Sequence, residues 1–310
     1  MRATLLAINE ELIRLKTAGV KDVSISDEAI ALLRKLAGAP EASAPTAQPQ
    51  TSVPAPAPSV PDPAPPTFGE RTKVVPRPAA AAAAAELPEA PEVSLPDGDK
   101  QTRWDALWDQ VKADAVCQKE LRPGKKVVLG VGNLDASIFF CGEAPGAEEE
   151  QQGEPFVGPA GQLLTKMIAG MGLQREDVYI GNIMNWRPRL PTSDDREQVG
   201  NRPPTAAEIT YCMPYLKAQL EVVQPRVIVA LGATAAKGLL GFDRFKALGE
   251  VRGKWHEFAG TPVMVTYHPS YILRNQSNRS KRVIWEDLLQ VMERVEMPVS
   301  EKQRGYFQAK

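Results

Sequence analysis

SIFFCGEAPGAEEEQQGEPFVGPAGQLL, residues 137–164, is the stretch that decides the fold. It begins with an apolar run, Ile138 to Cys141, which Gly142 bounds, and such a run predicts a short buried strand. Glycine and proline then break the chain, so we expect a glutamate-rich loop to leave the carboxyl end of this strand. Parallel α/β sheets bind ligands outside the carboxyl ends of their strands. This loop is therefore the first candidate for a functional site, and a solvated acidic turn is the alternative.

Strands and helices alternate along the region that follows. Apolar or β-branched runs at 178–183, 226–231 and 261–266 predict three more strands, and amphipathic segments between them predict helices. Such alternation is typical of a parallel sheet with helices on both faces. We therefore expect an α/β fold: a three-layer α/β/α sandwich around a short, mainly parallel four-stranded sheet. A further helix, starting near Thr102 and ending near Leu121, is predicted before the first strand, and residues 127–133 after it predict a short strand or an extended turn.

Composition divides the chain into four parts. Residues 1–37 carry two short amphipathic patterns and predict a helical hairpin. Residues 38–99 are rich in alanine and proline and predict a disordered linker whose only assigned role is spacing. The α/β domain occupies 100–297, and 298–310 form a C-terminal tail. Two short helices bury little surface alone, so the hairpin is expected to dock, either on a protein partner or on a second copy.

The bulk properties exclude several classes of protein. The chain has 310 residues, a net charge of −1 and three cysteines, which are odd in number and widely spaced. This cysteine usage argues against a disulfide framework. No apolar run approaches the roughly 18–20 residues of a membrane span, and the N-terminus lacks the apolar core of a signal peptide. We expect a cytoplasmic monomer without a membrane span.

Charge is unevenly distributed, although the total is close to zero. Between Arg244 and Arg282 there are 8 lysines and arginines against 2 acidic residues. A locally basic segment of this kind fits a phosphate-rich partner such as DNA, and a solvated face is the alternative.

Three strand ends carry polar groups: the loop from Gly142 to Gly146, Asn182, and the segment from His268 to Ser270. Parallel strands bring all three to one edge of the sheet, although they are far apart in sequence. His268 is one of only two histidines and stands just beyond a predicted strand. This context favours a functional role over a structural one.

These motifs resemble the uracil-DNA glycosylase superfamily, and in detail its iron–sulfur branch, family 4. The resemblance covers roughly residues 110–295, with the motifs in the family's order. The matching segments are Gly142-Glu143-Ala144-Pro145-Gly146, Gly153 to Leu164, Asn182 with Arg187-Pro188, Asn201-Arg202-Pro203, Leu231-Gly232-Ala233-Thr234-Ala235 and His268-Pro269-Ser270-Tyr271-Ile272-Leu273-Arg274.

The resemblance implies a pocket for a uracil base that has been flipped out of DNA. Phe156 would stack on the base, and Asn182 would hydrogen-bond its Watson–Crick edge. His268 would donate a hydrogen bond to uracil O2, where negative charge builds as the glycosidic bond breaks. The first motif would line the pocket with Gly142 and Ala144.

The remaining roles concern water, the sugar and DNA. Glu143 and Glu149 are both candidates for positioning water or stabilising the sugar cation. The best-known branch of the superfamily has aspartate where Ala144 stands, so a dedicated water-activating aspartate is absent here, as in family 4. Ser270 would hold a DNA phosphate, and Arg274 would add positive charge nearby.

The chain departs from family 4 at the iron–sulfur site. The family holds a four-iron cluster with four cysteines, whereas here only Cys117 and Cys212 remain as remnants of that set. Glu120 and Trp186 stand at the other two places. Two thiolates cannot supply four ligands, so we expect no cofactor and no metal, with Trp186 filling the space. The extra residues 189–200 also enlarge a loop near the pocket.

The sequence therefore predicts a DNA repair glycosylase that hydrolyses the N-glycosidic bond of uracil in DNA. One alternative is a glycosylase for another deaminated base. The other is a catalytically weak DNA-binding module, tethered through the hairpin to a repair or replication partner. Glu143, Phe156, Asn182 and His268 favour the enzymes, and the altered cluster site favours the module.

Overall fold

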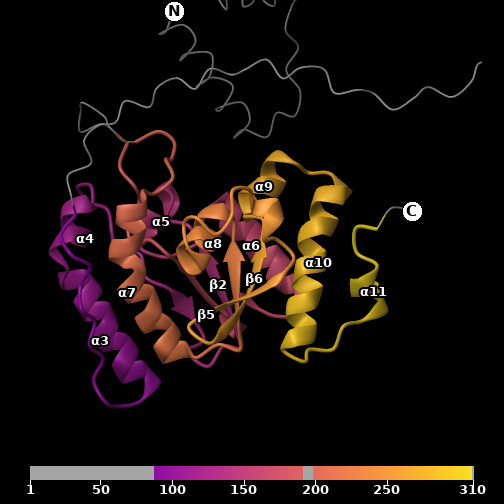
Figure 1. Cartoon of the computed structure of the whole chain (residues 1–310), viewed down its shortest axis with the longest axis horizontal. Coiled ribbons are helices and arrows are strands. Elements are labelled where there is room, and N and C mark those ends of the chain that lie inside the picture. The colour runs from indigo at the N-terminus through magenta and orange to yellow at the C-terminus, as the bar shows by residue number, and fades with distance from the viewer. Residues whose placement is uncertain (1–86, 191–197, 309–310) are drawn as a thin grey trace, which may run out of the picture. The chain divides into compact units, whose positions relative to one another are not determined.

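The computed structural model describes residues 87–190 and 198–308 (Figure 1). The chain divides into two units, Met1–Val74 and Val75–Lys310, and all described residues belong to the second. The predicted hairpin, most of the predicted linker and the middle of the insertion at 189–200 lie outside the described residues, so these predictions stay predictions.

A six-stranded sheet forms the centre of the domain, with the strand order β1-β3-β2-β4-β6-β5. Its inner four strands are mutually parallel: β3 (Tyr179–Asn182), β2 (Ile138–Gly142), β4 (Val227–Leu231) and β6 (Thr261–Thr266). These are the four predicted strands. Antiparallel strands β1 (Val131–Gly132) and β5 (Trp255–Phe258) border them.

The predicted class is therefore confirmed, but the predicted number of strands was wrong. β1 has only two residues, too few to show any periodicity. The four residues of β5 are intermediate or exposed, because this strand lies at an edge of the sheet. Its sequence therefore lacks the apolar run that marks the inner strands.

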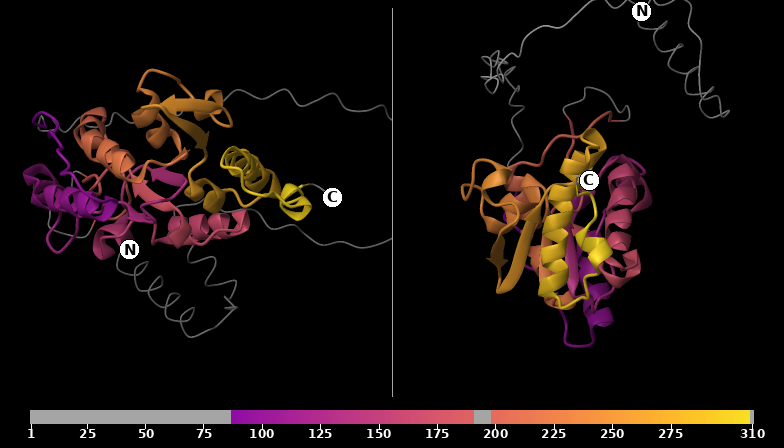
Figure 2. Two further views of the ribbon diagram at one scale, coloured as in Figure 1. Left: turned by 90° about the horizontal axis from the view of Figure 1, so that it is seen from below. Right: turned by 90° about the vertical axis from the view of Figure 1, so that its right-hand side faces the viewer.

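Helices cover both faces of the sheet (Figure 2). Alternate residues of each inner strand point to opposite faces, so Phe139 packs in one apolar cluster and Phe140 in the other. One face carries α3 (Lys100–Ala113), α4 (Ala115–Glu120), α7 (Ala206–Val223) and α8 (Ala233–Leu240), and the other carries α6 (Pro159–Met171), α9 (Pro269–Arg274) and α10 (Asn278–Arg294). This is the predicted α/β/α sandwich.

Local capping explains where the first helices begin and end. The segment predicted as one helix up to about Leu121 is divided at Asp114. The Asp114 side chain accepts a hydrogen bond from the backbone N–H of Cys117 at 2.6 Å, and this bond starts α4 as a separate helix. Asp114 also accepts hydrogen bonds from the hydroxyls of Tyr211 (2.7 Å) and Tyr215 (2.9 Å), which join α4 to α7.

The segments before and after the predicted domain pack on it. Val93 and Leu95, which precede α3, contact the apolar cluster on that side of the sheet. In the predicted tail, α11 (Glu301–Arg304) docks through Gln303, whose backbone oxygen accepts from the indole of Trp285 at 2.6 Å. Among the described residues, no helix is long and apolar enough to cross a membrane.

Candidate active site

A cavity of about 520 Å³ opens at the carboxyl edge of the parallel strands. The strand register explains its position, because Gly142 pairs with Asn182 and Leu231 pairs with Thr266, so the segments that follow these strands start side by side. The sequence-predicted residues that line it are Glu143, Ala144, Glu149, Phe156, Asn182, His268, Ser270 and Arg274. Gly142 lies directly behind it.

Gly142 lets Asn182 and Phe156, the two predicted base-binding residues, come close together. A Cβ at this position would lie 2.3 Å from Oδ1 of Asn182 and 2.4 Å from Cζ of Phe156. Real atoms do not approach so closely, so a side chain here would displace one of the two groups. The absence of a side chain therefore allows the amide and the aromatic ring to share one wall of the cavity.

The backbone of Phe156 is held in an unusual conformation. Its φ is 55°, in the left-handed region that costs energy for a residue with a side chain. A Cβ at Gly161, the third residue of α6, would lie 1.8 Å from the carbonyl oxygen of Phe156, so glycine at 161 leaves room for this backbone. The Phe156 ring stacks on the imidazole of His268, with centroids 5.7 Å apart and planes at 29°.

Asn182 lines the cavity, and its side chain carries an unsatisfied acceptor. The residue is 5% exposed, and its Oδ1 is buried with no hydrogen-bond partner within the described part of the chain. A buried polar atom without a partner costs free energy, and such atoms in native proteins are few. A donor brought by a ligand would satisfy it.

His268 is held as a neutral donor. Its Nδ1 accepts a hydrogen bond from the backbone N–H of Ser270 at 3.2 Å and lies 2.9 Å from the Ser270 hydroxyl. Burial, together with the positive charge of Arg274, lowers the pKa of His268 to about 4. Because Nδ1 is the acceptor, the proton of the neutral ring is carried by Nε2. Ser270, predicted as a phosphate contact, therefore also orients this ring.

The structure distinguishes the two candidate carboxylates. Glu149 accepts hydrogen bonds from the backbone N–H groups of Gly146 (3.0 Å), Val157 (3.1 Å) and Gly158 (2.9 Å), so its oxygens hold the loop together. Glu143 instead hydrogen-bonds the side chain of Thr234. Burial raises the pKa of Glu143 above its ordinary value, and the bond to Thr234 opposes this shift.

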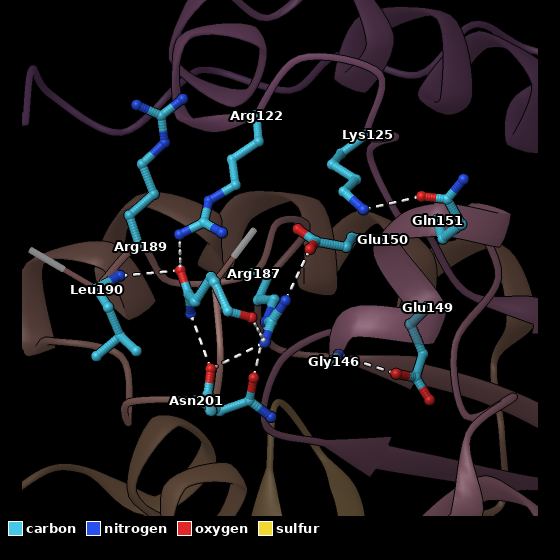
Figure 3. A network of polar contacts seen from close by, with 12 residues as sticks. Arg122, Lys125, Gly146, Glu149, Glu150, Gln151, Arg187, Arg189, Leu190 and Asn201 are labelled. Atoms are coloured by element: carbon cyan, nitrogen blue, oxygen red, sulfur yellow. Dashed lines mark hydrogen bonds and ion pairs between the residues drawn. The ribbon is translucent and has the colours of Figure 1, made fainter. Parts of the chain in front are cut away.

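The acidic segment is not the loop that the sequence suggests, because it forms a short helix, α5 (Ala147–Gln152). Glu150 in this helix is buried, and its Oε1 lies 2.8 Å from Nη1 of Arg187 (Figure 3). Arg187 is itself buried and donates through Nε to Oδ1 of Asn201 at 2.7 Å. This ion pair excludes the solvated-turn alternative for Glu150.

Asn201 belongs to the segment Asn201-Arg202-Pro203, for which the sequence predicts no role. The structure places this residue in the wall of the cavity. The hydrogen bond from Nε of Arg187 to its Oδ1 fixes the orientation of this amide. Gln198, also buried, donates through Nε2 to the carbonyls of Pro188 (3.1 Å) and Gly200 (3.1 Å), which closes the base of the insertion beside Asn201. The sequence signals for this network were the segments Arg187-Pro188 and Asn201-Arg202-Pro203, and neither of them indicates Glu150 as the partner of Arg187.

Comparisons with known proteins agree with this geometry. The model of the uracil DNA glycosylase superfamily matches residues 129–289. A type-4 uracil-DNA glycosylase of Thermotoga maritima is 42% identical over 181 residues, which cover 58% of this chain and 88% of that protein. This chain belongs to the uracil DNA glycosylase superfamily.

Other members of the superfamily show the same relationship. A type-4 uracil-DNA glycosylase of Archaeoglobus fulgidus is 43% identical over 177 residues, covering 54% of this chain and 84% of that protein. A type-5 uracil-DNA glycosylase of Pyrobaculum aerophilum is 30% identical over 167 residues, covering 53% and 72%. Identity is thus higher to these type-4 proteins than to the type-5 protein.

Three of the residues predicted to stand at the place of the type-4 cluster, Cys117, Cys212 and Trp186, share one apolar cluster in the structure. Cys117 and Cys212 are buried, and burial raises the pKa of both thiols, which favours the neutral thiol over the thiolate. Trp186 is fully buried with them and packs edge-on against Tyr211 at 6.1 Å. The described residues contain no group of three histidine, cysteine or acidic side chains that could hold a metal.

The indole nitrogen of Trp186 lies within this apolar cluster. It is buried and finds no hydrogen-bond partner among the described residues. Most buried donors in proteins are paired. A large ring therefore occupies this space through its apolar contacts and not through a polar role.

We expect Gly142→Ala to lower the free energy of unfolding by about 1–3 kcal/mol, the usual cost of overpacking a dense site. The added methyl group would press on Asn182 and Phe156. Denaturant melts followed by tryptophan fluorescence measure the change. Gly249→Ala is the matched control, because a Cβ at 249 meets nothing within 4 Å. Equal stability of the two variants would contradict the packing described for Gly142.

Proposed function

We propose that this chain is a DNA repair glycosylase that hydrolyses the N-glycosidic bond of uracil in DNA. The observation that carries the proposal is the buried, unpartnered Oδ1 of Asn182 beside the ring of Phe156. Uracil offers one N–H and one carbonyl oxygen next to each other on its Watson–Crick edge. An amide that accepts through Oδ1 and donates through Nδ2 matches both groups.

This pairing separates uracil from cytosine. Cytosine presents an acceptor at N3 and an amino donor at N4, so each group would face a like group on Asn182. A site that leaves buried polar groups unpaired rejects the wrong ligand strongly. Phe156 adds stacking, which favours any flat base and does not distinguish among them.

His268 would stabilise the leaving group. As the bond between the sugar and N1 breaks, its electron pair passes to the base, and negative charge appears on O2 of uracil. The Nε2–H of a neutral imidazole, oriented by Ser270, would donate to this oxygen. Because the pKa of His268 is about 4, the imidazole is neutral near pH 7 and its protonation does not change there.

Glu143 is the carboxylate that we assign to the attack of water on the sugar. Its side chain lines the cavity and has fewer protein partners than Glu149, which accepts three backbone hydrogen bonds. We propose that Glu143 orients the water that adds to the sugar carbon and stabilises the positive charge on the sugar. Glu149 is then a positioning residue, which shapes the loop around Phe156.

DNA binding is assigned to the rim of the cavity and to the basic segment. Ser270 and Arg274 stand at the rim, after His268. Contacts of this kind to phosphates set affinity and register but carry no base specificity. We also propose that the chain acts as a cytoplasmic monomer, and that the hairpin at 1–37 binds a protein partner.

We expect His268→Ala to lower single-turnover uracil excision by roughly 10²–10³-fold, the scale of losing one oriented donor to a developing anion. DNA affinity should stay nearly constant, because phosphate contacts set it. Asn182→Ala should instead erode the choice between uracil and cytosine. Rates on one uracil-containing and one cytosine-containing oligonucleotide, each single- and double-stranded, measure both effects.

His256→Ala is the matched control for His268→Ala. It removes the other histidine, whose Nε2 lies 2.9 Å from the backbone oxygen of Val251, away from the residues that line the cavity. Its excision rate should equal that of the wild type. Negligible excision by the wild type, unchanged in every variant, would support the DNA-binding module. Excision of hypoxanthine but not of uracil would support another deaminated base.

The protonation of Glu143 should set how the excision rate changes with pH. The carboxylate is needed ionised, and its pKa is raised, so excision should fall as the pH decreases through a value above the ordinary range of glutamate. His268, with a pKa of about 4, should add no step near neutral pH. Glu143→Gln should lose this acid limb and be slow throughout. An acid limb that persists in Glu143→Gln would assign it to another group.

We further propose that the protein carries no iron–sulfur cluster, with Trp186 and Tyr211 packing in its place. Purified protein should be colourless and contain no stoichiometric iron. Iron analysis and visible absorption, on protein purified without oxygen to protect any cluster, test this expectation. A content near four iron atoms per chain, the number in such a cluster, would overturn the proposal.

A further inference from the structure

A buried carboxylate, Asp287, lies outside the cavity on the inner side of α10. The residue is 1% exposed. Nη1 of Arg252 contacts both of its oxygens, at 2.8 and 2.9 Å, and the hydroxyl of Thr266 donates to its Oδ2 at 2.6 Å. Burial raises the pKa of Asp287 to about 6, although both of these contacts act in the opposite direction. The fold therefore retains a costly polar group here, where apolar side chains could pack.

The partner of Asp287 connects it to the cavity. Thr266 is the last residue of β6 and is fully buried, and His268 follows two residues later. The backbone oxygen of Thr266 accepts from the N–H of Gly232 at 2.9 Å. Both the backbone and the side chain of Thr266 are therefore fixed at the point where the strand ends.

The residue between them is held as well. The guanidinium of Arg252 lies over the ring of Tyr267, 5.6 Å from its centroid. The other aromatic contact of Tyr267 is a stack on Tyr271 of α9, with centroids 4.3 Å apart and planes at 14°. One arginine thus contacts both Asp287 and Tyr267, which joins α10 to the segment that enters α9.

His268 contacts two other segments that line the cavity. A Cβ at Gly232, whose φ is 93°, would lie 3.1 Å from Cβ of His268, so the start of this side chain lies close to the end of β4. The imidazole ring stacks on Phe156. A shift of the end of β6 would therefore move the imidazole relative to both Gly232 and Phe156.

We propose that Asp287, acting through the hydroxyl of Thr266, is a positioning residue that sets the placement of His268 in the cavity. The inference rests on the proposed function, because it explains how the Nε2–H of His268 would be kept in the position from which it donates to the base. A donor that misses the developing charge by a fraction of an ångström loses much of its effect. The polar contact fixes one geometry, whereas apolar packing would allow several.

Thr266→Val tests the contact directly, since it removes the hydroxyl and keeps the branched shape that suits a strand. We expect the single-turnover excision rate to fall by about tenfold, a modest share of what misplacement can cost, with DNA affinity unchanged. Thr266→Ser restores a hydroxyl and should recover most of the rate. Thr261→Val is the matched control, because it makes the same change at the opposite end of β6.

A second comparison separates positioning from general stability. In a His268→Ala background the imidazole is gone, so Thr266→Val should cause no further loss of excision. The same tenfold loss in both backgrounds would show that Thr266 acts independently of His268 and would overturn the proposal. An unchanged rate for Thr266→Val in the wild-type background would overturn it as well.

A measurement without activity keeps the inference separate from the proposed function. The chain has two histidines, so nitrogen-15 NMR of the imidazoles gives two sets of signals. Thr266→Val should shift the signals of His268 and leave those of His256 in place. Unmoved His268 signals, or equal shifts in both rings, would overturn the positioning role. If the wild type excised no uracil, the proposed function would fail, and these signals would still decide the placement of His268.

Discussion

The parallel pairing of β2 with β3, and of β4 with β6, is the constraint on which the site depends. It places Gly142 opposite Asn182 and Leu231 opposite Thr266, so the chain leaves all four strands at one edge. Residues more than a hundred positions apart in sequence then form one cavity. Gly142 is the critical position in this arrangement, because only a residue without a side chain lets the Asn182 amide and the Phe156 ring meet. The proposed recognition of uracil depends on that arrangement.

Around this contact, buried charges fix the segments that have no regular structure. The pair of Glu150 and Arg187 ties α5 to the chain beyond β3 and orients Asn201. Asp287 of α10 pairs with Arg252, accepts from the hydroxyl of Thr266 at the end of β6, and so joins α10 to that strand end. Arg252 in turn lies over the ring of Tyr267, the first residue beyond β6. Buried ion pairs contribute little net stability, but they favour one geometry over others, and a catalytic site needs a single geometry.

Side-chain contacts join the chain segments that carry Cys117, Trp186 and Cys212. Here Asp114 joins α4 to α7 through the hydroxyls of Tyr211 and Tyr215, and Trp186 packs against Tyr211. Arg189 adds hydrogen bonds to the carbonyls of Glu120 (2.9 Å) and Leu121 (2.5 Å), at the end of α4. Hydrogen bonds and aromatic packing thus connect the segments that carry Cys117 and Cys212.

The amino-acid sequence by itself determined the class of fold and most members of the site. Apolar runs marked the four inner strands, because strands covered on both faces bury every side chain. Glycine, proline and polar residues marked the ends of those strands, so Asn182 and His268 could be named in advance. Of the edge strands, β1 lies within the segment 127–133 that predicts either a short strand or an extended turn, and β5 was missed because its four residues are intermediate or exposed.

Tertiary structure alone decided the roles of individual polar groups. In sequence, Glu143, Glu149 and Glu150 are three nearby acids, but one lines the cavity, one binds three backbone N–H groups and one is buried against Arg187. Asp287 belongs to an amphipathic helix in sequence and to the support of His268 in space. The physical reason is that the protonation and partners of a charged group depend on burial and on neighbours distant in sequence, and only the folded chain supplies both.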